Sequence, residues 1–435
     1  MYFTIFHEMK RIIIHIKELG PIKDADIELA PFMIFTGISN LGKSYTNFLA
    51  YYVFTVFANN RIHQFIANKI EGKLKQKEEF DFSLTINELC IWMMRDVKIF
   101  FQDLLKYPNI PCDVSFDFGL ENIKYDIHFK KTKDLLIGND QTLSLAIVTI
   151  NGEDRPFIST NNKTTILASS NIAHKMSKDI FGHELYRSFL LPPGRASLLD
   201  NGYTVQSEAG RIGMYNIFLR DYDILMDKGM EESKKRNDQQ FFSSRIQKLI
   251  NGKLIKNQDG VSLELKNGRV VPISATASSI KELSPILFWI QNRIINNDSI
   301  CIEEPEAHAH PEMQQNIADL LVACANKGAF MQITTHSDYL LSRFNQLIKL
   351  NNLKKNNIEN FEKYCKNNEH NPNLTLDPDI IKAYYFYIDE NNNIKIKKQS
   401  LHNGIPLDSF SKIVLKQIET DSFFEELEGK ENYEE

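Results

Sequence analysis

The feature that most constrains this chain is residues 37–44, which read G-I-S-N-L-G-K-S and fit the phosphate-binding pattern G-x-x-x-x-G-K-[ST]. The loop follows the apolar run 33–35 and precedes a helix-compatible stretch, 45–57. The pattern needs this strand, loop and helix order, because backbone N–H groups of the loop and of the helix N-terminus point at the phosphates. Average composition would give the pattern by chance in roughly one of fifty such chains. We therefore interpret it as a phosphate-binding loop rather than an ordinary glycine-containing turn.

Each position of the loop has an expected physical role. Gly37 and Gly42 permit positive φ angles and close approach of the backbone to a ligand. Asn40 stands where related loops often carry glycine, and asparagine tolerates the left-handed region. Lys43 is expected to neutralise the β- and γ-phosphates of ATP, and the Ser44 hydroxyl to ligate Mg²⁺. The remaining backbone N–H donors expected to face the nucleotide are those of Ile38, Ser39 and Leu41.

Composition limits the other possibilities. The 435 residues are 43% hydrophobic and 25% charged, which is typical of a soluble globular protein. A net charge of −5 gives no global nucleic-acid signature, so any DNA contact must be a local patch. The five cysteines show no C-x-x-C spacing, which fits a reducing compartment. With no signal-peptide pattern and no apolar run of spanning length, we expect a cytoplasmic protein without membrane contact.

The first half of the chain mixes strand and helix patterns. Segments 11–19 and 23–29 alternate like two strands around Gly20-Pro21. Residues 59–107 have a helical pattern, and strand-like segments follow from 113 to 169, including 113–118 and 164–167. We interpret 59–180 as an insertion of helices and strands between the phosphate loop and the rest of the nucleotide-binding domain.

The second half begins with 184–191, which ends at the turn Pro192-Pro193-Gly194. Residues 216–250 are expected to be helical, and 253–273 to form a hairpin with turn signals at Asp259-Gly260 and Asn267-Gly268. The Asn- and Lys-rich stretch 351–373 favours a solvated linker or loop. We expect 351–435 to be a linker and small C-terminal extension, whose acidic last residues, 425–435, fray.

Two further apolar strands end in polar groups. The segment 299–306 reads S-I-C-I-E-E-P-E, and 329–337 reads A-F-M-Q-I-T-T-H-S. Glu303 is expected to hold a metal ion, Glu304 to polarise the attacking water, and His336 to reach the γ-phosphate. The alternatives are a surface acidic turn and a structural histidine. The order of loop, acidic strand and histidine strand favours the catalytic interpretation.

Together these motifs resemble ABC-class ATPases of the overcoming-lysogenization-defect (OLD) type, relatives of SMC and Rad-type ATPases that are common in bacterial anti-phage systems. The segments that carry the resemblance are G-I-S-N-L-G-K-S, I-E-E-P-E-A-H-A-H-P and T-T-H-S-D-Y-L-L, with I-K-E-L-G-P-I-K-D-A-D-I-E-L near the N-terminus. The resemblance implies an α/β P-loop NTPase of the ABC type, with a mixed sheet, built from 1–58 and 181–350. It also implies ATP and Mg²⁺ as cofactors and a homodimer, or a higher oligomer, with composite ATP sites.

The segment 274–283, S-A-T-A-S-S-I-K-E-L, is similar to the signature motif of that family. The resemblance implies that Ser278 and Ser279 open a helix that binds the γ-phosphate held by a second subunit. The usual glycine of the motif is not evident, and an ordinary serine-rich N-cap is the alternative. Arg195 resembles an arginine that follows a proline turn in the family, and either a role near phosphate or a surface salt bridge is possible.

Other polar clusters favour simpler interpretations. His308 and His310 lie near Glu304 and Glu306, but their spacing before Pro311 is not that of a helical metal-ligand pair. Asp377-Pro378-Asp379 fits a helix N-cap with proline at the first helical position, and not a nuclease metal pair. Lys234-Lys235-Arg236 could touch a DNA backbone, but a solvated helix face is the more common use of such a run.

These observations leave three functional hypotheses. The leading one is an ATPase that dimerises around ATP and gates a partner effector, a nuclease or toxin, in anti-phage defence. The second is a DNA-maintenance ATPase of the SMC type, against which the missing coiled coil and acidic net charge count. The third is a non-hydrolysing, ATP-dependent scaffold that holds a toxin or nuclease inactive, against which an intact Glu304 counts.

Overall fold

The structure, a computed structural model, describes most of the chain. The described residues are 9–58, 61–74, 76–120, 123–137, 141–160, 163–199, 213–232, 239–257, 260–292, 295–402, 404–407 and 414–424. The basic run 234–236, residue Asp259 of one turn signal and the acidic residues 425–435 lie outside these ranges.

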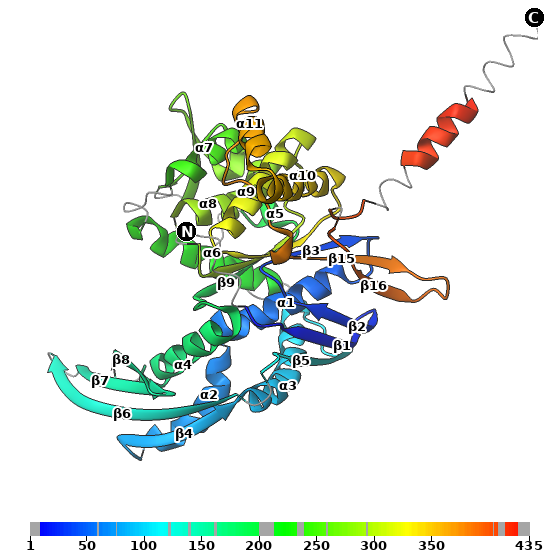
Figure 1. The fold of residues 1–435 in the computed structure, drawn as a ribbon. Helices are drawn as coiled ribbons and strands as arrows, with labels where there is room; N and C mark the ends of the chain where they lie inside the picture. Colours follow the sequence, from blue (N-terminus) through cyan, green and yellow to red (C-terminus); the bar gives the residue numbers. More distant parts are fainter. Residues whose placement is uncertain are drawn as a thin grey trace, which may run out of the picture.

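The centre of the molecule is a six-stranded sheet in the order β16-β15-β3-β14-β13-β9 (Figure 1). Its strands are β3 (Phe32–Gly37), β9 (Arg187–Leu191), β13 (Asp298–Glu303), β14 (Phe330–Thr334), β15 (Ile381–Ile388) and β16 (Ile394–Lys398). Neighbours run parallel except β15 and β16, which form an antiparallel hairpin. The fold is therefore mixed α/β, as the sequence predicts, and strands from both ends of the chain meet around β3.

Alternate residues of these strands enter two different hydrophobic cores. In β3, Met33 and Phe35 join the first core, whereas Phe32 and Ile34 join the second. The first core contains α1 (Lys43–Ala58), whose residues are almost all buried. The helices that supply most of the second core are α7 (Gln239–Ile250), α8 (Ser278–Asn292), α9 (Pro311–Asn326), α10 (Asp338–Asn356) and α11 (Ile358–Asn367). Burial on both faces explains why the central strands are continuous apolar runs.

A second sheet of three strands, in the order β2-β1-β5, also belongs to the first core. Its strands are β1 (Ile13–Leu19), β2 (Ile22–Glu28) and β5 (Cys112–Asp117). The antiparallel pairing of β1 and β2 around Gly20-Pro21 confirms the two strands predicted there. Gly20 has a φ of 55°, and a side chain at this position would collide with the ring of Tyr45.

The predicted insertion contains both helices and strands. Its elements are α2 (Ile62–Leu74), β4 (Glu79–Thr85), α3 (Ile86–Leu105), β6 (Lys124–Ile137), β7 (Gln141–Ile150), β8 (Glu153–Thr160) and α4 (Thr164–Phe181). These strands form a separate sheet in the order β4-β6-β7-β8 (Figure 1), whereas β5, which also lies within 59–180, pairs with β1 in the three-stranded sheet. The strand predicted at 164–167 is wrong, because these residues open α4. The buried Ala168, Ile172 and Met176 follow helical spacing and override the local β-branched residues.

The segment between β9 and β13 agrees with the sequence patterns. It contains α5 (Arg195–Leu199), α6 (Gly213–Glu232), α7 and the strands β10 (Gly252–Asn257), β11 (Gly260–Leu265) and β12 (Val270–Pro272). The predicted hairpin is confirmed and extended to three antiparallel strands. Gly268 has a φ of 79°, as the Asn267-Gly268 turn requires.

The prediction that 351–373 is a linker or loop is wrong. Helix α10 continues to Asn356, and α11 buries Phe361 and Cys365 one turn apart. Beyond them, Asp377 caps the short 3₁₀ turn 378–380 by accepting the N–H of Asp379, which confirms the predicted cap. The chain then enters the central sheet as β15 and β16, so a domain boundary near residue 350 would divide that sheet.

Within the described residues, no helix is both long enough and apolar enough to cross a membrane.

Candidate active site at the ends of the parallel strands

The loop 37–44 joins β3 to α1 at the carboxyl edge of the central sheet. Gly37, Asn40 and Gly42 have φ angles of 120°, 63° and 92°, so the predicted left-handed positions are present. A side chain at Gly37 would place its Cβ 2.2 Å from the carbonyl oxygen of Phe386 in β15. Glycine is therefore required there by both the backbone angle and the neighbouring strand.

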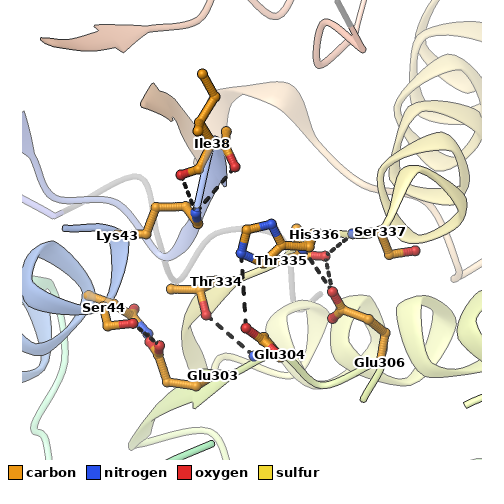
Figure 2. A network of polar contacts seen from close by, with 12 residues as sticks. Ile38, Lys43, Ser44, Glu303, Glu304, Glu306, Thr334, Thr335, His336 and Ser337 are labelled. Carbon is orange, nitrogen blue, oxygen red and sulfur yellow. Dashed lines mark hydrogen bonds and ion pairs between the residues drawn. The ribbon is translucent and has the colours of Figure 1, made fainter. Parts of the chain in front are cut away.

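Lys43 folds back over its own loop (Figure 2). Its Nζ donates to the carbonyl oxygens of Ile38, at 2.7 Å, and of Gly37, at 3.2 Å. Burial lowers the pKa of Lys43 to about 8, although the negative charges of Glu303 and Glu304 oppose this shift. An ammonium group held by neutral carbonyls gains from a nearby anion, so this lysine is suited to phosphate.

Ser44 and Glu303 meet at the start of α1. The Ser44 hydroxyl donates to one carboxylate oxygen of Glu303, and Asn47 Nδ2 donates to the other at 2.5 Å. Burial raises the pKa of Glu303, while these hydrogen bonds oppose the shift. A hydroxyl and a carboxylate side by side are hard oxygen donors of the kind that Mg²⁺ prefers. The residues present therefore fit a magnesium ion.

Glu304 adopts an unusual backbone conformation directly after β13. Its φ is 46°, which is uncommon for a residue other than glycine and costs of order 1–3 kcal/mol. The N–H of Glu304 donates to the carbonyl oxygen of Thr334 at 3.1 Å, which fixes the turn against β14. The carboxylate lies 3.9 Å from Nε2 of His336 (Figure 2). In this left-handed backbone conformation the Glu304 side chain lies on the side of the histidine strand.

The backbone at His336 is positioned by hydrogen bonds to a buried acid, Glu306. Glu306 accepts the hydroxyl of Thr335 at 2.6 Å and the backbone N–H of His336 at 2.9 Å (Figure 2). Burial and the positive charge of Lys43 lower the pKa of His336, while Glu304 opposes the shift, and the lowered pKa favours the neutral imidazole. The next residue, Ser337, caps α10 by accepting the N–H of Leu340 at 3.0 Å.

These groups surround one pocket of about 430 Å³. Its lining comes from the phosphate loop, the β1–β2 turn and the ends of β13 and β14, and consists of Pro21, Ser39, Asn40, Gly42, Lys43, Ser44, Tyr45, Glu303, Glu304, Thr334 and His336. The sequence did not single out Asn47, Thr334 or Tyr45. Asn47 lies almost one helical turn after Ser44, so helical spacing alone could have identified it.

Six predicted residues do not line this pocket. Three of them, Gly37, Ile38 and Leu41, belong to the phosphate loop itself, and the other three are Ser278, Ser279 and Arg195. Ser278 and Ser279 are the first residues of α8, where Ser278 is exposed and Ser279 is half-buried. Arg195 is completely buried, which contradicts the alternative of a surface salt bridge. Its guanidinium donates to the carbonyl oxygens of Glu303, Pro192 and Glu282, and its Nε lies 3.2 Å from the Glu282 carboxylate. Direct contact with a nucleotide is therefore not possible in this conformation.

The histidines after the acidic strand have separate positions. His308 is exposed, with a φ of 61°, and the His310 side chain caps α9 by accepting the N–H of Glu312 at 3.4 Å. No group of three or more potential metal-binding His, Cys, Asp or Glu side chains occurs among the described residues.

Comparison with a family model supports the nucleotide-binding interpretation for part of the chain. Residues 219–341 match the family described as AAA ATPase domain. The match includes Glu303, Glu304 and His336 but covers less than a third of the chain, and the phosphate loop lies outside it. No curated protein matches the chain.

Solved structures similar to the chain include heads of SMC proteins. A SmcHead bound to the C-winged helix domain of ScpA is 13% identical, with 91% of this chain and 98% of that chain covered and a TM-score of 0.38. The SMC head domain from Thermotoga maritima is 10% identical, with 90% and 100% covered and a TM-score of 0.33. A Smc head domain with an extended coiled coil from Pyrococcus furiosus, bound to the C-terminal domain of ScpA, is 12% identical, with 94% and 99% covered and a TM-score of 0.34. Because these scores are low, the α/β assignment rests on the strand order, and residues 219–341 are the part of the chain similar to AAA ATPase domains.

Proposed function

We propose that the chain binds and hydrolyses ATP with Mg²⁺ in the pocket between the phosphate loop and the ends of β13 and β14. The observation that carries the proposal is that residues from distant parts of the sequence meet at one cavity. Lys43, Ser44, Glu303, Glu304 and His336 come from three separate parts of the sequence and line or border one cavity. A structural role for any one of these residues would not require the others beside it.

Each polar group has a role in binding phosphate. The loop N–H groups and the N-terminus of α1 bind the phosphate oxygens. Lys43 exchanges its carbonyl partners for the β- and γ-phosphates, a change from neutral to charged acceptors that strengthens its hydrogen bonds. Ser44 and Glu303 would hold Mg²⁺, which supplies charge neutralisation at the phosphates.

The other side of the pocket performs the proton chemistry. Glu304 accepts a proton from the attacking water and orients it toward the γ-phosphate. Neutral His336 donates one N–H to the γ-phosphate, and Glu306 positions it through Thr335 and the His336 backbone. Arg195 is a positioning residue, because it holds the carbonyl oxygen of Glu303 from beneath the pocket.

The active form is a dimer in which each ATP contacts both subunits. In support, the N-terminus of α8, a 15-residue helix, carries Ser278 and Ser279 on the surface and outside the pocket of its own chain. The helix dipole and two hydroxyl donors suit an anion supplied by a second copy. The gated effector and the role in anti-phage defence rest on the resemblance to the OLD type alone.

Isothermal titration calorimetry with MgATP and the variant Lys43→Ala tests the site. ATP affinity is expected to fall by at least tenfold, because the cation facing the phosphates is lost. Lys349→Ala, which removes an exposed lysine of α10, is the matched control and should bind like the wild type. Equal affinity of the wild type and Lys43→Ala would show that 37–44 is only a turn.

A further inference from the structure

The hairpin of β15 and β16 has two chemically different faces. Its inner face carries Tyr384 and Phe386, which are buried in the first core, and Lys398, which pairs with Glu28 at 2.5 Å. Its outer face carries Tyr385 and Tyr387 on β15. Lys397 lies directly opposite Tyr385, and Lys395 lies opposite Tyr387. Residues opposite each other in an antiparallel pair project to the same side, so two tyrosines and two lysines share this face.

The two tyrosines pack against each other as a stacked pair. Their ring centroids are 6.1 Å apart and the rings are inclined by only 12°. Both are half-buried, so the rings are fixed by their surroundings while part of each stays accessible. A pre-ordered aromatic pair loses little side-chain entropy when a base packs against its accessible ring surface.

The lysines give this face a positive charge. In the described part of the chain neither Lys395 nor Lys397 forms a salt bridge, in contrast to Lys398. Asp389 of the hairpin turn accepts the backbone N–H groups of Asn393 and Asn391, and these hydrogen bonds, together with the positive charge of Lys395, lower its pKa. Lys397 has no such acidic neighbour among the described residues. Lysines on an edge strand also discourage pairing with other strands, but that purpose does not need tyrosines opposite them.

We propose that this outer face, Tyr385, Tyr387, Lys395 and Lys397, binds single-stranded nucleic acid. Stacking on aromatic rings combined with phosphate contacts from lysines is how sheet surfaces bind single strands without reading sequence. A protein partner would need a larger apolar surface, and a duplex would hide the base faces that the tyrosines can stack on. The acidic net charge of the whole chain is compatible with this local patch.

The position of the face connects it to the phosphate loop. Phe386, between the two tyrosines, accepts the N–H of Ile38 at 3.1 Å, and Ile38 in turn accepts the ammonium of Lys43 at 2.7 Å. Nucleic acid that shifts β15 therefore shifts the loop, and occupancy of the two sites should be coupled. This coupling, unlike the binding itself, rests on the proposed ATP site.

Fluorescence anisotropy with labelled 20-mers of dT and of rU, at several salt concentrations, tests the binding. The wild type is expected to bind both, and a duplex of the same length more weakly. Tyr385→Ala with Tyr387→Ala should weaken binding by at least about tenfold. Tyr385→Phe with Tyr387→Phe, which keeps the stacking rings, should bind like the wild type.

The affinity of the wild type is expected to fall as salt rises. In Lys395→Gln with Lys397→Gln the plot of log affinity against log salt should be less steep by about 1.4, the value for two lost phosphate contacts with a single strand. The control, Lys349→Gln with Lys363→Gln, changes exposed lysines of α10 and α11 and should leave the slope unchanged. Binding should persist in Lys43→Ala, so the result is independent of the ATP site. Equal affinity of wild type and the alanine pair would overturn the proposal. The proposal would also be overturned if Tyr385→Ala with Tyr387→Ala changed the oligomeric state, measured by light scattering, and left the oligonucleotide affinity unchanged. The face would then join two copies of the chain.

The coupling is measured as ATP affinity with and without a saturating 20-mer. A shift in the wild type that disappears in the Tyr385→Ala, Tyr387→Ala variant supports it. An oligonucleotide that binds the wild type and leaves ATP affinity unchanged would overturn the coupling, while the binding face would stand.

Discussion

Lys43 is a pocket residue whose charge changes within an experimentally accessible pH range. Burial holds its pKa at about 8, and bound phosphates would raise it because they favour the charged form. The bound state therefore holds more protons than the free state when the pH lies above 8. By linkage, ATP affinity then falls as the pH rises, by about tenfold per unit.

We expect proton uptake when ATP binds at pH 8.5. Calorimetry in two buffers with different ionisation enthalpies measures it, because absorbed protons come from the buffer. Lys43→Arg, whose side chain stays charged, should bind ATP without this uptake. Equal heats in both buffers for the wild type would contradict the role of Lys43.

Among single residues, the sequence predicts those that belong to a motif. It does not predict the partners that tertiary structure brings beside them. The spacing of 37–44 requires positive φ at Gly37 and Gly42, and both are present. In contrast, Glu306 and Glu282 are 30 and 87 residues away from their partners His336 and Arg195. Nothing in the local pattern identifies such partners, because they meet only through strand pairing and helix packing.

At the scale of helices and strands, one buried ion pair and a hydrogen bond from its arginine connect α5, α8 and β13. Arg195 at the start of α5 pairs with Glu282 of α8 and donates to the carbonyl oxygen of Glu303, the last residue of β13. Both side chains are almost fully buried, at 0% and 1% exposure. Removing one partner leaves a buried charge without compensation, at a cost of about 3–5 kcal/mol, whereas replacing both by apolar residues is often nearly neutral.

Arg195→Met is therefore expected to lower the free energy of unfolding by about 3–5 kcal/mol. Arg195→Met with Glu282→Met should recover most of that loss, although the turn at Glu303 stays unsupported. Urea denaturation of wild type, both single variants and the pair measures the coupling as a double-mutant cycle. Additive effects would show that the two side chains do not stabilise each other.

Helices and strands were predicted correctly where the apolar residues show a strong periodic pattern. The prediction was wrong where it relied on amino-acid composition alone. The apolar runs of β3, β13 and β14 and the helical spacing of α1 were identified from sequence. The Asn and Lys content of 351–373 favours a loop, whereas the structure has the end of α10 and all of α11 there. Only Phe361 and Cys365 face the core in α11, a signal too sparse to outweigh the polar residues.

At the scale of the whole molecule, the arrangement depends on pairing between distant segments. Strand β15 lies beside β3 although more than 340 residues separate Phe35 from its partner Tyr384. No turn chemistry or periodicity encodes such a parallel pairing, so the C-terminal part could not be placed from sequence. The surface position of the α8 N-terminus likewise becomes clear only in the folded chain.

A mixing experiment tests the proposed dimer. Ser279→Arg puts bulk and positive charge where a second copy would bring its ATP, so ATPase activity should fall while nucleotide binding persists. A mixture of Ser279→Arg and Lys43→Ala subunits should regain partial activity. In a mixed dimer, one composite site combines the intact phosphate loop of the first subunit with the intact α8 N-terminus of the second. Asn367→Arg, at the exposed end of α11, is the control. Wild-type turnover by Ser279→Arg alone would show that Ser278 and Ser279 are an ordinary N-cap.

The most direct test of the ATPase is the turnover of Glu304→Gln. This change keeps the size of the side chain but removes the charge that accepts the proton from water. Turnover should fall by about two to four orders of magnitude, with ATP affinity retained and the ATP-bound state trapped. Glu312→Gln, an exposed acid at the start of α9, should hydrolyse ATP like the wild type. Equal rates for Glu304→Gln and the wild type, or no hydrolysis by the wild type, would contradict the account.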